Sequence, residues 1–143
     1  MQLVGNRRAR FEYEIEEKYV AGIVLTGHEV KSVRLKQASL AGSYVQILDG
    51  EAFLLNALIT PYKFASLPDY EPQQTRKLLL RKSELLALQS LKKDKNRTLV
   101  PLSFELEHNK IKVIVGVGKA RKKADKRQYL KKRAEVRDQQ ALL

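Results

Sequence analysis

Four carboxylates lie close together near the N-terminus of the chain, at Glu12, Glu14, Glu16 and Glu17. Paired carboxylates are what a glycosidase uses for acid–base and nucleophilic chemistry. Apolar residues occupy positions 11, 13 and 15 between them, and this alternation predicts a half-buried strand. Side chains two residues apart on a strand share a face. We therefore interpret these carboxylates as the solvent face of a strand and not as a catalytic pair.

The histidines and glycines give no stronger indication of catalysis. His28 and His108 are the only histidines; both lie in predicted turns, without the serine and aspartate partners of a nucleophilic triad. Gly116–Lys119 is similar to part of a phosphate loop but lacks its full spacing and following helix, so we interpret it as a flexible loop. The absence of cysteine excludes disulfides and thiolate-bound zinc. We predict no enzyme, no metal site and no cofactor.

Basic residues are more informative, because they recur along the whole chain. The net charge is +12 and the pI about 10.0, which predicts a nucleic-acid partner. No recognition helix, zinc finger or heptad indicates duplex DNA, whereas irregular RNA is read through shape, phosphates and 2′-hydroxyls. The candidate RNA-binding residues from this argument are Asn6, Arg7, Arg8, Arg10, Lys31, Arg34, Arg76, Lys77 and Lys112.

The C-terminal segment concentrates this charge. Residues 119–143 contain ten lysines and arginines against three acids, a net +7. Like charges oppose helix formation, so we predict a tail that is disordered when free and helical when bound. Residues 1–118 then form one domain. No apolar run approaches the roughly 20 residues that cross a bilayer, and no export signal is recognisable; we expect a cytoplasmic monomer that binds no membrane.

The elements that position these residues are predicted mainly as strands. The strands cover Phe11–Glu16, Ala21–Gly27, Tyr44–Leu48, Glu51–Leu55, Lys77–Arg81, Thr98–Leu106 and Ile111–Val117, and short helices cover Glu29–Lys36 and Ser83–Leu91. Asp49-Gly50 and His108-Asn109 are the predicted hairpin turns. Thr60–Gln74 contains three prolines and is predicted as a loop. Without a βαβ rhythm, this order predicts a mainly β fold, a small antiparallel barrel of the oligonucleotide-binding type.

Several motifs resemble small protein B, the family of bacterial SsrA-binding proteins. They are Asn6-Arg-Arg-Ala-Arg-x-Glu-Tyr13, Ala21-Gly-Ile-x-Leu-x-Gly-x-Glu-Val-Lys-Ser32, Ser43-Tyr-Val, Asp49-Gly-Glu, Glu71-Pro-x-x-x-Arg-Lys-Leu-Leu-Leu80 and Asp125-Lys-Arg127. They follow the family's order over nearly the whole chain. The resemblance implies a partner of transfer-messenger RNA that rescues stalled ribosomes. The barrel would hold the tRNA-like domain, and the tail would enter the empty mRNA channel and the decoding centre.

The resemblance also assigns individual residues. It implies RNA binding by Leu79 and Lys112, and by position 20, where Val20 replaces the family's usual Glu. Gln74 replaces a usual Arg, and Ala124 a usual His or Tyr. The residues expected to act on the ribosome are Lys119, Arg121, Lys122, Asp125, Lys126, Arg127, Leu142 and Leu143. Two alternatives stay open: an RNA-processing enzyme on a small barrel, and a general ribosome-associated basic protein.

Overall fold

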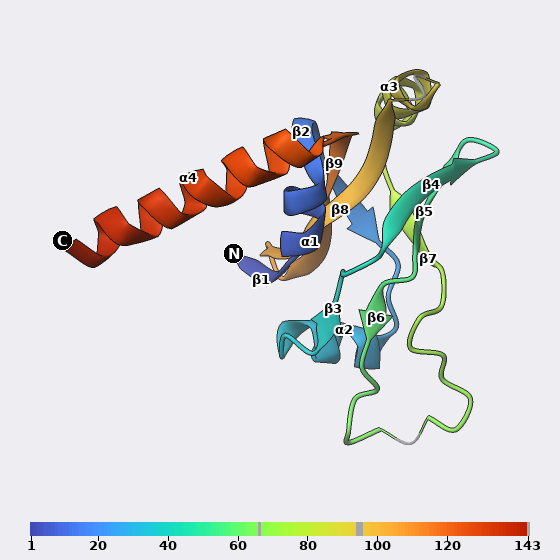
Figure 1. Cartoon of the computed structure of the whole chain (residues 1–143). Coiled ribbons are helices and arrows are strands. Elements are labelled where there is room, and N and C mark those ends of the chain that lie inside the picture. The colour runs from blue at the N-terminus through green and yellow to red at the C-terminus, as the bar shows by residue number, and fades with distance from the viewer. Residues whose placement is uncertain (66, 94–95, 143) are drawn as a thin grey trace.

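The protein is described by a computed structural model that covers residues 1–65, 67–93 and 96–142, with side chains to residue 137. Figure 1 shows a curled sheet at the centre, α2 and α3 at opposite ends, and α4 projecting away. The helices are α1 (Arg7–Glu12), α2 (Gly27–Arg34), α3 (Lys82–Lys92) and α4 (Lys123–Leu142). With these four helices the fold is mixed α/β, which corrects the mainly β prediction.

Seven strands form one antiparallel sheet in the order β1-β8-β9-β2-β7-β5-β4. They are β1 (Gln2–Gly5), β2 (Tyr13–Ile23), β4 (Tyr44–Leu48), β5 (Glu51–Leu55), β7 (Arg76–Leu79), β8 (Arg97–Glu107) and β9 (Lys110–Ala120). The short strands β3 (Ala38–Ser39) and β6 (Leu58–Ile59) pair separately. The curled sheet encloses the main core, in which Phe104, Leu54 and Val115 pack with Val33 of α2 and Leu88 of α3.

The sheet is open, which corrects the prediction of a closed barrel. The edge strand β4 packs near β8, but no backbone ladder joins the two in the described part of the chain. The N-terminal segment occupies the backbone hydrogen-bonding groups of β8 that β4 would need in order to close a barrel. Strand β1 pairs with Ser103–Glu105, while Asn6 bonds the carbonyl of Leu102 through its backbone N–H and that of Pro101 through its side chain.

Both predicted hairpins are confirmed. Leu48 pairs with Glu51 across Asp49-Gly50, and Glu107 pairs with Lys110 across His108-Asn109. All four turn residues have positive φ, as a two-residue turn of type I′ requires.

The N-terminal third differs from its prediction. Phe11 and Glu12 end helix α1. Strand β2 then runs without a break from Tyr13 to Ile23, so it joins the rest of the first predicted strand to the first three residues of the second, Ala21–Gly27. Helix α1 covers a second small core, in which Ala9 packs on Val100 and Leu102. The predicted loop at Gly116–Lys119 is part of β9. A Cβ on Gly116 would lie 2.9 Å from Leu102 Cδ1, so this glycine permits close packing under α1.

Candidate nucleic-acid interface

Three of the predicted RNA-binding residues lie side by side on the outer face of the sheet. Gly22 of β2 is opposite Leu79 of β7 on one side and Lys112 of β9 on the other. Val20 precedes Gly22 by two residues on the same face. Val20 and Leu79 are 50% and 52% exposed. The antiparallel register therefore brings Val20, Leu79 and Lys112 together from distant parts of the chain.

These residues line a shallow depression of about 600 Å³. A Cβ on Gly22 would lie 3.3 Å from Leu79 Cβ, so the missing side chain lets Leu79 approach β2 closely. Two further cations, Lys18 and Arg81, line the same depression. We call this surface the strand face; it consists of Lys18, Val20, Gly22, Leu79, Arg81 and Lys112.

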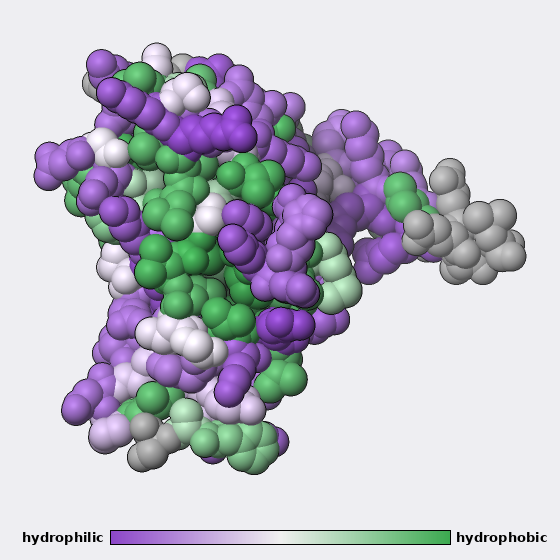
Figure 2. Space-filling view, turned by 180° about the vertical axis from the view of Figure 1, so that it is seen from behind, coloured by the Kyte–Doolittle hydropathy of each residue, from purple (hydrophilic) through white to green (hydrophobic). Residues whose placement is uncertain are grey.

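The strand face combines exposed apolar side chains with cations. Lysine and arginine bind phosphates and release counterions from the nucleic acid, and exposed apolar groups can pack on a base or ribose. Two acids, Glu84 and Glu107, also line the depression, so the cations do not form a uniform field. The view from behind (Figure 2) shows such a mixture, with a hydrophobic area surrounded by hydrophilic side chains. This chemistry suits binding and does not provide a nucleophile or a metal site.

Arg76 does not belong to this surface, although it was predicted to face the RNA. Along β7 buried and exposed residues alternate, so Lys77 and Leu79 point outward while Arg76 points inward and is 2% exposed. The Arg76 guanidinium donates to Glu29 Oε2 at 2.7 and 2.9 Å. It also donates to the carbonyls of Ala57 and Pro72. Arg76 therefore serves the fold and cannot reach a phosphate at the surface.

Glu29, the partner of Arg76, is a structural residue that sequence reasoning missed. It is 1% exposed and also accepts hydrogen bonds from Tyr70 and Gln74. Burial alone would raise the pKa of Glu29, but the Thr26 backbone N–H and the Arg76 guanidinium outweigh burial and lower it. Thr26 and Glu29 form a capping box at the start of α2; this Thr-x-x-Glu spacing was the available signal. Nothing local to the sequence identifies Arg76 as the partner.

The arginines of α1 form a second basic surface. Arg7 and Arg8 are exposed, Arg10 is half-buried, and all three line one cavity beside Ser39. Asn6 is buried instead: its side chain caps α1 at Ala9 N–H and donates to two backbone carbonyls. Asn6 thus holds the helix that presents the arginines.

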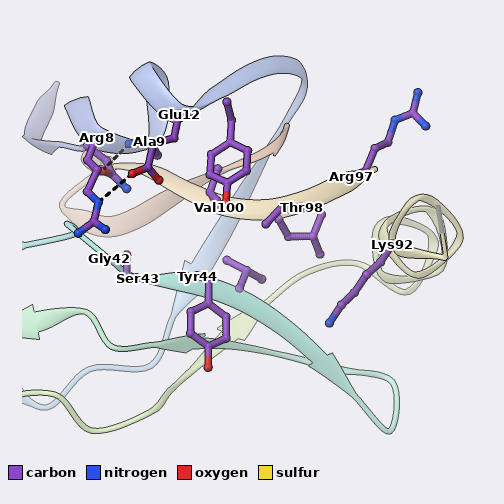
Figure 3. A pocket seen from close by; sticks show the side chains of 14 residues that line it. Arg8, Ala9, Glu12, Gly42, Ser43, Tyr44, Lys92, Arg97, Thr98 and Val100 are labelled. Carbon is purple, nitrogen blue, oxygen red and sulfur yellow. Dashed lines mark hydrogen bonds and ion pairs between the residues drawn. The ribbon is translucent and has the colours of Figure 1, made fainter. Parts of the chain in front are cut away.

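A pocket of about 400 Å³ lies between α1, β4 and β8. Figure 3 shows Arg8 and Glu12 side by side on α1 and Lys92 extending from α3 toward β4. Arg8 Nε is 3.1 Å from Glu12 Oε1, so part of its charge is neutralised. This pocket offers polar side chains beside Arg8 and no catalytic arrangement.

Helix α2 carries two further predicted residues, Lys31 and Arg34. Both are exposed, and α2 packs against β1 and β6, apart from the strand face. Lys77 is exposed on β7 and pairs with Glu51 at 3.1 Å. The predicted RNA-binding residues therefore fall on the strand face, α1 and α2, with Lys77 exposed separately on β7 and with Asn6 and Arg76 inside the fold.

The tail begins against α1 and continues as the helix α4. The structure has this helix where the sequence predicts disorder in the free protein. The Arg121 backbone N–H donates to the Glu12 carbonyl at 2.8 Å, and the Arg121 guanidinium lies 4.4 Å from the ring centroid of Tyr129. The rings of Phe11 and Tyr129 are 6.4 Å apart. These contacts, which sequence reasoning missed, give the first turns of α4 a support on α1.

Of the remaining predicted tail residues, Lys119 lies in β9, opposite Glu14 and Arg97, and the others lie along α4 or just before it. Lys119, Lys122, Asp125 and Arg127 are exposed, while Lys126 is half-buried with its Nζ 5.4 Å from the ring centroid of Phe11. The side chain of Leu142 and all of Leu143 lie outside the described residues.

Three of the four acids of the predicted cluster are solvated, as the sequence predicts, whereas Glu12 lies on α1, half-buried and paired with Arg8. Glu14, Glu16 and Glu17 are exposed, and Glu16 pairs with Arg97 at 2.9 Å. Among the described residues, no group of three or more histidine or acidic side chains is placed to hold a metal ion. The described helices include none that is long and apolar enough to cross a membrane.

Comparisons with known proteins give matches over nearly the whole chain. The family model described as SmpB protein matches residues 3–143. An SsrA-binding protein of Lactobacillus delbrueckii subsp. bulgaricus is 44% identical over 95% of this chain and 89% of its own. One of Staphylococcus aureus is 43% identical over 95% and 88%. A solved structure described as "tmRNA-SmpB: a journey to the center of the bacterial ribosome" has a TM-score of 0.72 and 38% identity, covering 91% of this chain and 95% of that one.

Proposed function

We propose, because this chain belongs to the SmpB protein family, that it is an RNA-binding adaptor for transfer-messenger RNA in trans-translation. It holds the tRNA-like domain of that RNA and delivers it to stalled ribosomes. The supporting observation is that the family match spans residues 3–143, so it includes the strand face and the tail together. This role is not catalytic. In this proposal the protein works in the bacterial cytoplasm as a monomer.

Residues 1–118 form the RNA-binding part in this proposal. Val20, Leu79 and Lys112 on the strand face hold the tRNA-like domain, the role that a strand face has in oligonucleotide-binding folds. The arginines of α1, the cations of α2 and Lys77 add phosphate contacts. Asn6 and Arg76 act indirectly, by holding α1 and β7 in place.

Residues 119–143 form the part that acts on the ribosome. The tail's net charge of +7 can follow the phosphates of ribosomal RNA along the mRNA channel, and a helix presents these cations on a rigid support. Asp125, Lys126 and Arg127 then lie at the decoding centre, and Leu142 and Leu143 at the far end of the tail.

Capture from a bacterial lysate tests this proposal. The tagged protein should retain one dominant RNA with a tRNA-like end. A variant with Leu79→Asp and Lys112→Glu should lose that RNA, whereas Lys82→Glu with Leu86→Asp makes the same charge change on α3 and should retain it. Recovery of bulk ribosomal RNA alone would support a general ribosome-associated basic protein instead.

A further inference from the structure

An aromatic and basic cluster lies away from the strand face, where the loop after β6 meets α2. The rings of Tyr62 and Phe64 meet nearly edge to face, with centroids 5.4 Å apart. Lys31 Nζ lies 5.3 Å from the Tyr62 centroid, and Lys63 Nζ lies 4.9 Å from the Phe64 centroid. We call these four residues the loop cluster.

Phe64 contributes little to the core. Its side chain is 74% exposed, while Tyr62 beside it is half-buried. A buried aromatic ring stabilises a fold because its apolar surface is removed from water. The exposed Phe64 ring contributes little of this stabilisation. The half-buried Tyr62 supports the exposed ring from one side. This arrangement presents a flat apolar surface to solvent next to two ammonium groups.

The charges around the loop cluster favour an anionic polymer. Lys63 is next to Phe64, and the two acids of the same loop, Asp69 and Glu71, lie further along the chain. On α2, Lys31 and Arg34 are exposed, while the one acid of this helix, Glu29, is buried and paired with Arg76 at 2.7 Å. Aromatic rings stack bases of any identity, and neighbouring cations hold the phosphates. One exposed ring offers little apolar area for holding a membrane, which requires a larger buried face.

We propose that the loop cluster stacks an unpaired base of the bound RNA on Phe64, with Lys31 and Lys63 at the flanking phosphates. The inference rests on the proposed function, since RNA is the partner. It adds an RNA-contacting site at the α2 end of the molecule, distinct from the strand face and from the tail. Lys63, now over the Phe64 ring, moves to a phosphate when the base stacks.

A Phe64→Trp variant tests this directly. The chain has no tryptophan, so the new indole is the single fluorophore of its kind and keeps an aromatic face for stacking. Its emission should be quenched when transfer-messenger RNA is added. Quenching should be weaker when a ten-nucleotide oligoadenylate is added. Leu86→Trp, on the exposed surface of α3, is the matched control; it should bind the RNA without quenching. Filter retention of the RNA is measured on the same samples.

A second variant removes the ring. Phe64→Ala should fold normally and bind transfer-messenger RNA about 5- to 100-fold more weakly, as expected for the loss of one stacked base. Leu86→Ala should bind like the unaltered protein.

The outcomes separate this inference from the proposed function. The base-stacking inference alone would be overturned if Phe64→Trp retained the RNA with unchanged emission. It would also be overturned if Leu86→Trp were quenched as strongly as Phe64→Trp. No retention by either variant or by the unaltered chain would overturn both. A blue shift of Phe64→Trp with phosphatidylglycerol vesicles, and no response to RNA, would show a membrane-contacting loop and reject base stacking.

Discussion

Replacing Arg76 by alanine separates a structural arginine from an RNA-binding one. The guanidinium is 2% exposed and bonds Glu29 at 2.7 and 2.9 Å. Lys77, the next residue, is 45% exposed and pairs with Glu51 at 3.1 Å. The two neighbours carry the same charge and form ion pairs in opposite environments, so Lys77→Ala is the matched control.

The structure sets the expected loss of stability for each variant. Removing one partner of a buried ion pair costs about 3–5 kcal/mol, because it leaves a buried charge without compensation. The Glu29 carboxylate would keep donors from Thr26, Tyr70 and Gln74, so we expect Arg76→Ala to lower the free energy of unfolding by about 3 kcal/mol, the lower end of that range. Loss of the exposed Lys77 pair should lower it by about 0–1 kcal/mol.

Urea unfolding at two pH values measures the difference in stability between Arg76→Ala and the unaltered protein. In the unaltered protein the pKa of Glu29 lies below its ordinary value of 4.5, so its stabilisation is complete above that pH and is lost as the pH falls through the lowered pKa. In Arg76→Ala the guanidinium no longer opposes the effect of burial, which raises the pKa. The destabilisation caused by Arg76→Ala should therefore be largest near neutral pH and shrink toward about pH 4.

Two results would refute this reasoning. One is an Arg76→Ala protein that unfolds within about 0.5 kcal/mol of Lys77→Ala. The other is a folded Arg76→Ala protein whose RNA affinity depends less steeply on salt than that of the unaltered protein. A decrease of about 0.7–0.9 units in the log–log slope would correspond to the loss of one phosphate contact. That would place the guanidinium at the RNA.

Three further predictions concern the strand face and the tail. Lys112→Ala should reduce the salt slope of RNA binding by about 0.7–0.9 units, measured by filter binding against Lys82→Ala; equal slopes would remove Lys112 from the interface. Val20→Glu should tighten binding of the tRNA-like domain, since a charge-assisted hydrogen bond contributes about 1.5–3 kcal/mol before desolvation. The control Val24→Glu, at an equally exposed valine, should not tighten binding. Weaker binding by Val20→Glu would indicate a site rebuilt around an apolar residue. Removing residues 123–143, which takes away α4 and leaves β9 whole, should leave the melting temperature and RNA affinity nearly unchanged and abolish peptide tagging on stalled ribosomes. Full tagging would exclude α4 from the mechanism.

Local signals predicted the hairpins and two of the helices. Asp49-Gly50 and His108-Asn109 adopt positive φ, which few residue types accept easily, so the turns can be read directly from the sequence. The predicted helices correspond to α2 and α3, although Arg81 and not Ser83 precedes the first turn of α3. Helix α1 was missed because the N-cap role of Asn6 was not recognised, and because Phe11 and Glu12 at the end of the helix begin the alternation that continues into β2.

The site depends on contacts between distant segments, which local patterns cannot provide. The strand face arises from the register of β7, β2 and β9. Arg76 and Leu78 are two residues apart and therefore share a face of β7, but the run Arg76-Lys77-Leu78-Leu79 has no polar–apolar alternation to indicate which face is buried. A buried arginine is expensive without a partner, and the partner Glu29 lies on a helix far away in sequence.

Directed hydroxyl-radical cleavage is the most direct test of RNA binding by the strand face. The chain has no cysteine, so an iron chelate can be attached at one introduced thiol. Glu107→Cys places it on the rim of the depression, and Leu48→Cys, at the tip of the β4–β5 hairpin, is the control. We predict cuts within the tRNA-like domain of transfer-messenger RNA from position 107 and none at those nucleotides from position 48. Equal cleavage from both positions, or cuts from position 107 only outside the tRNA-like domain, would contradict the assignment.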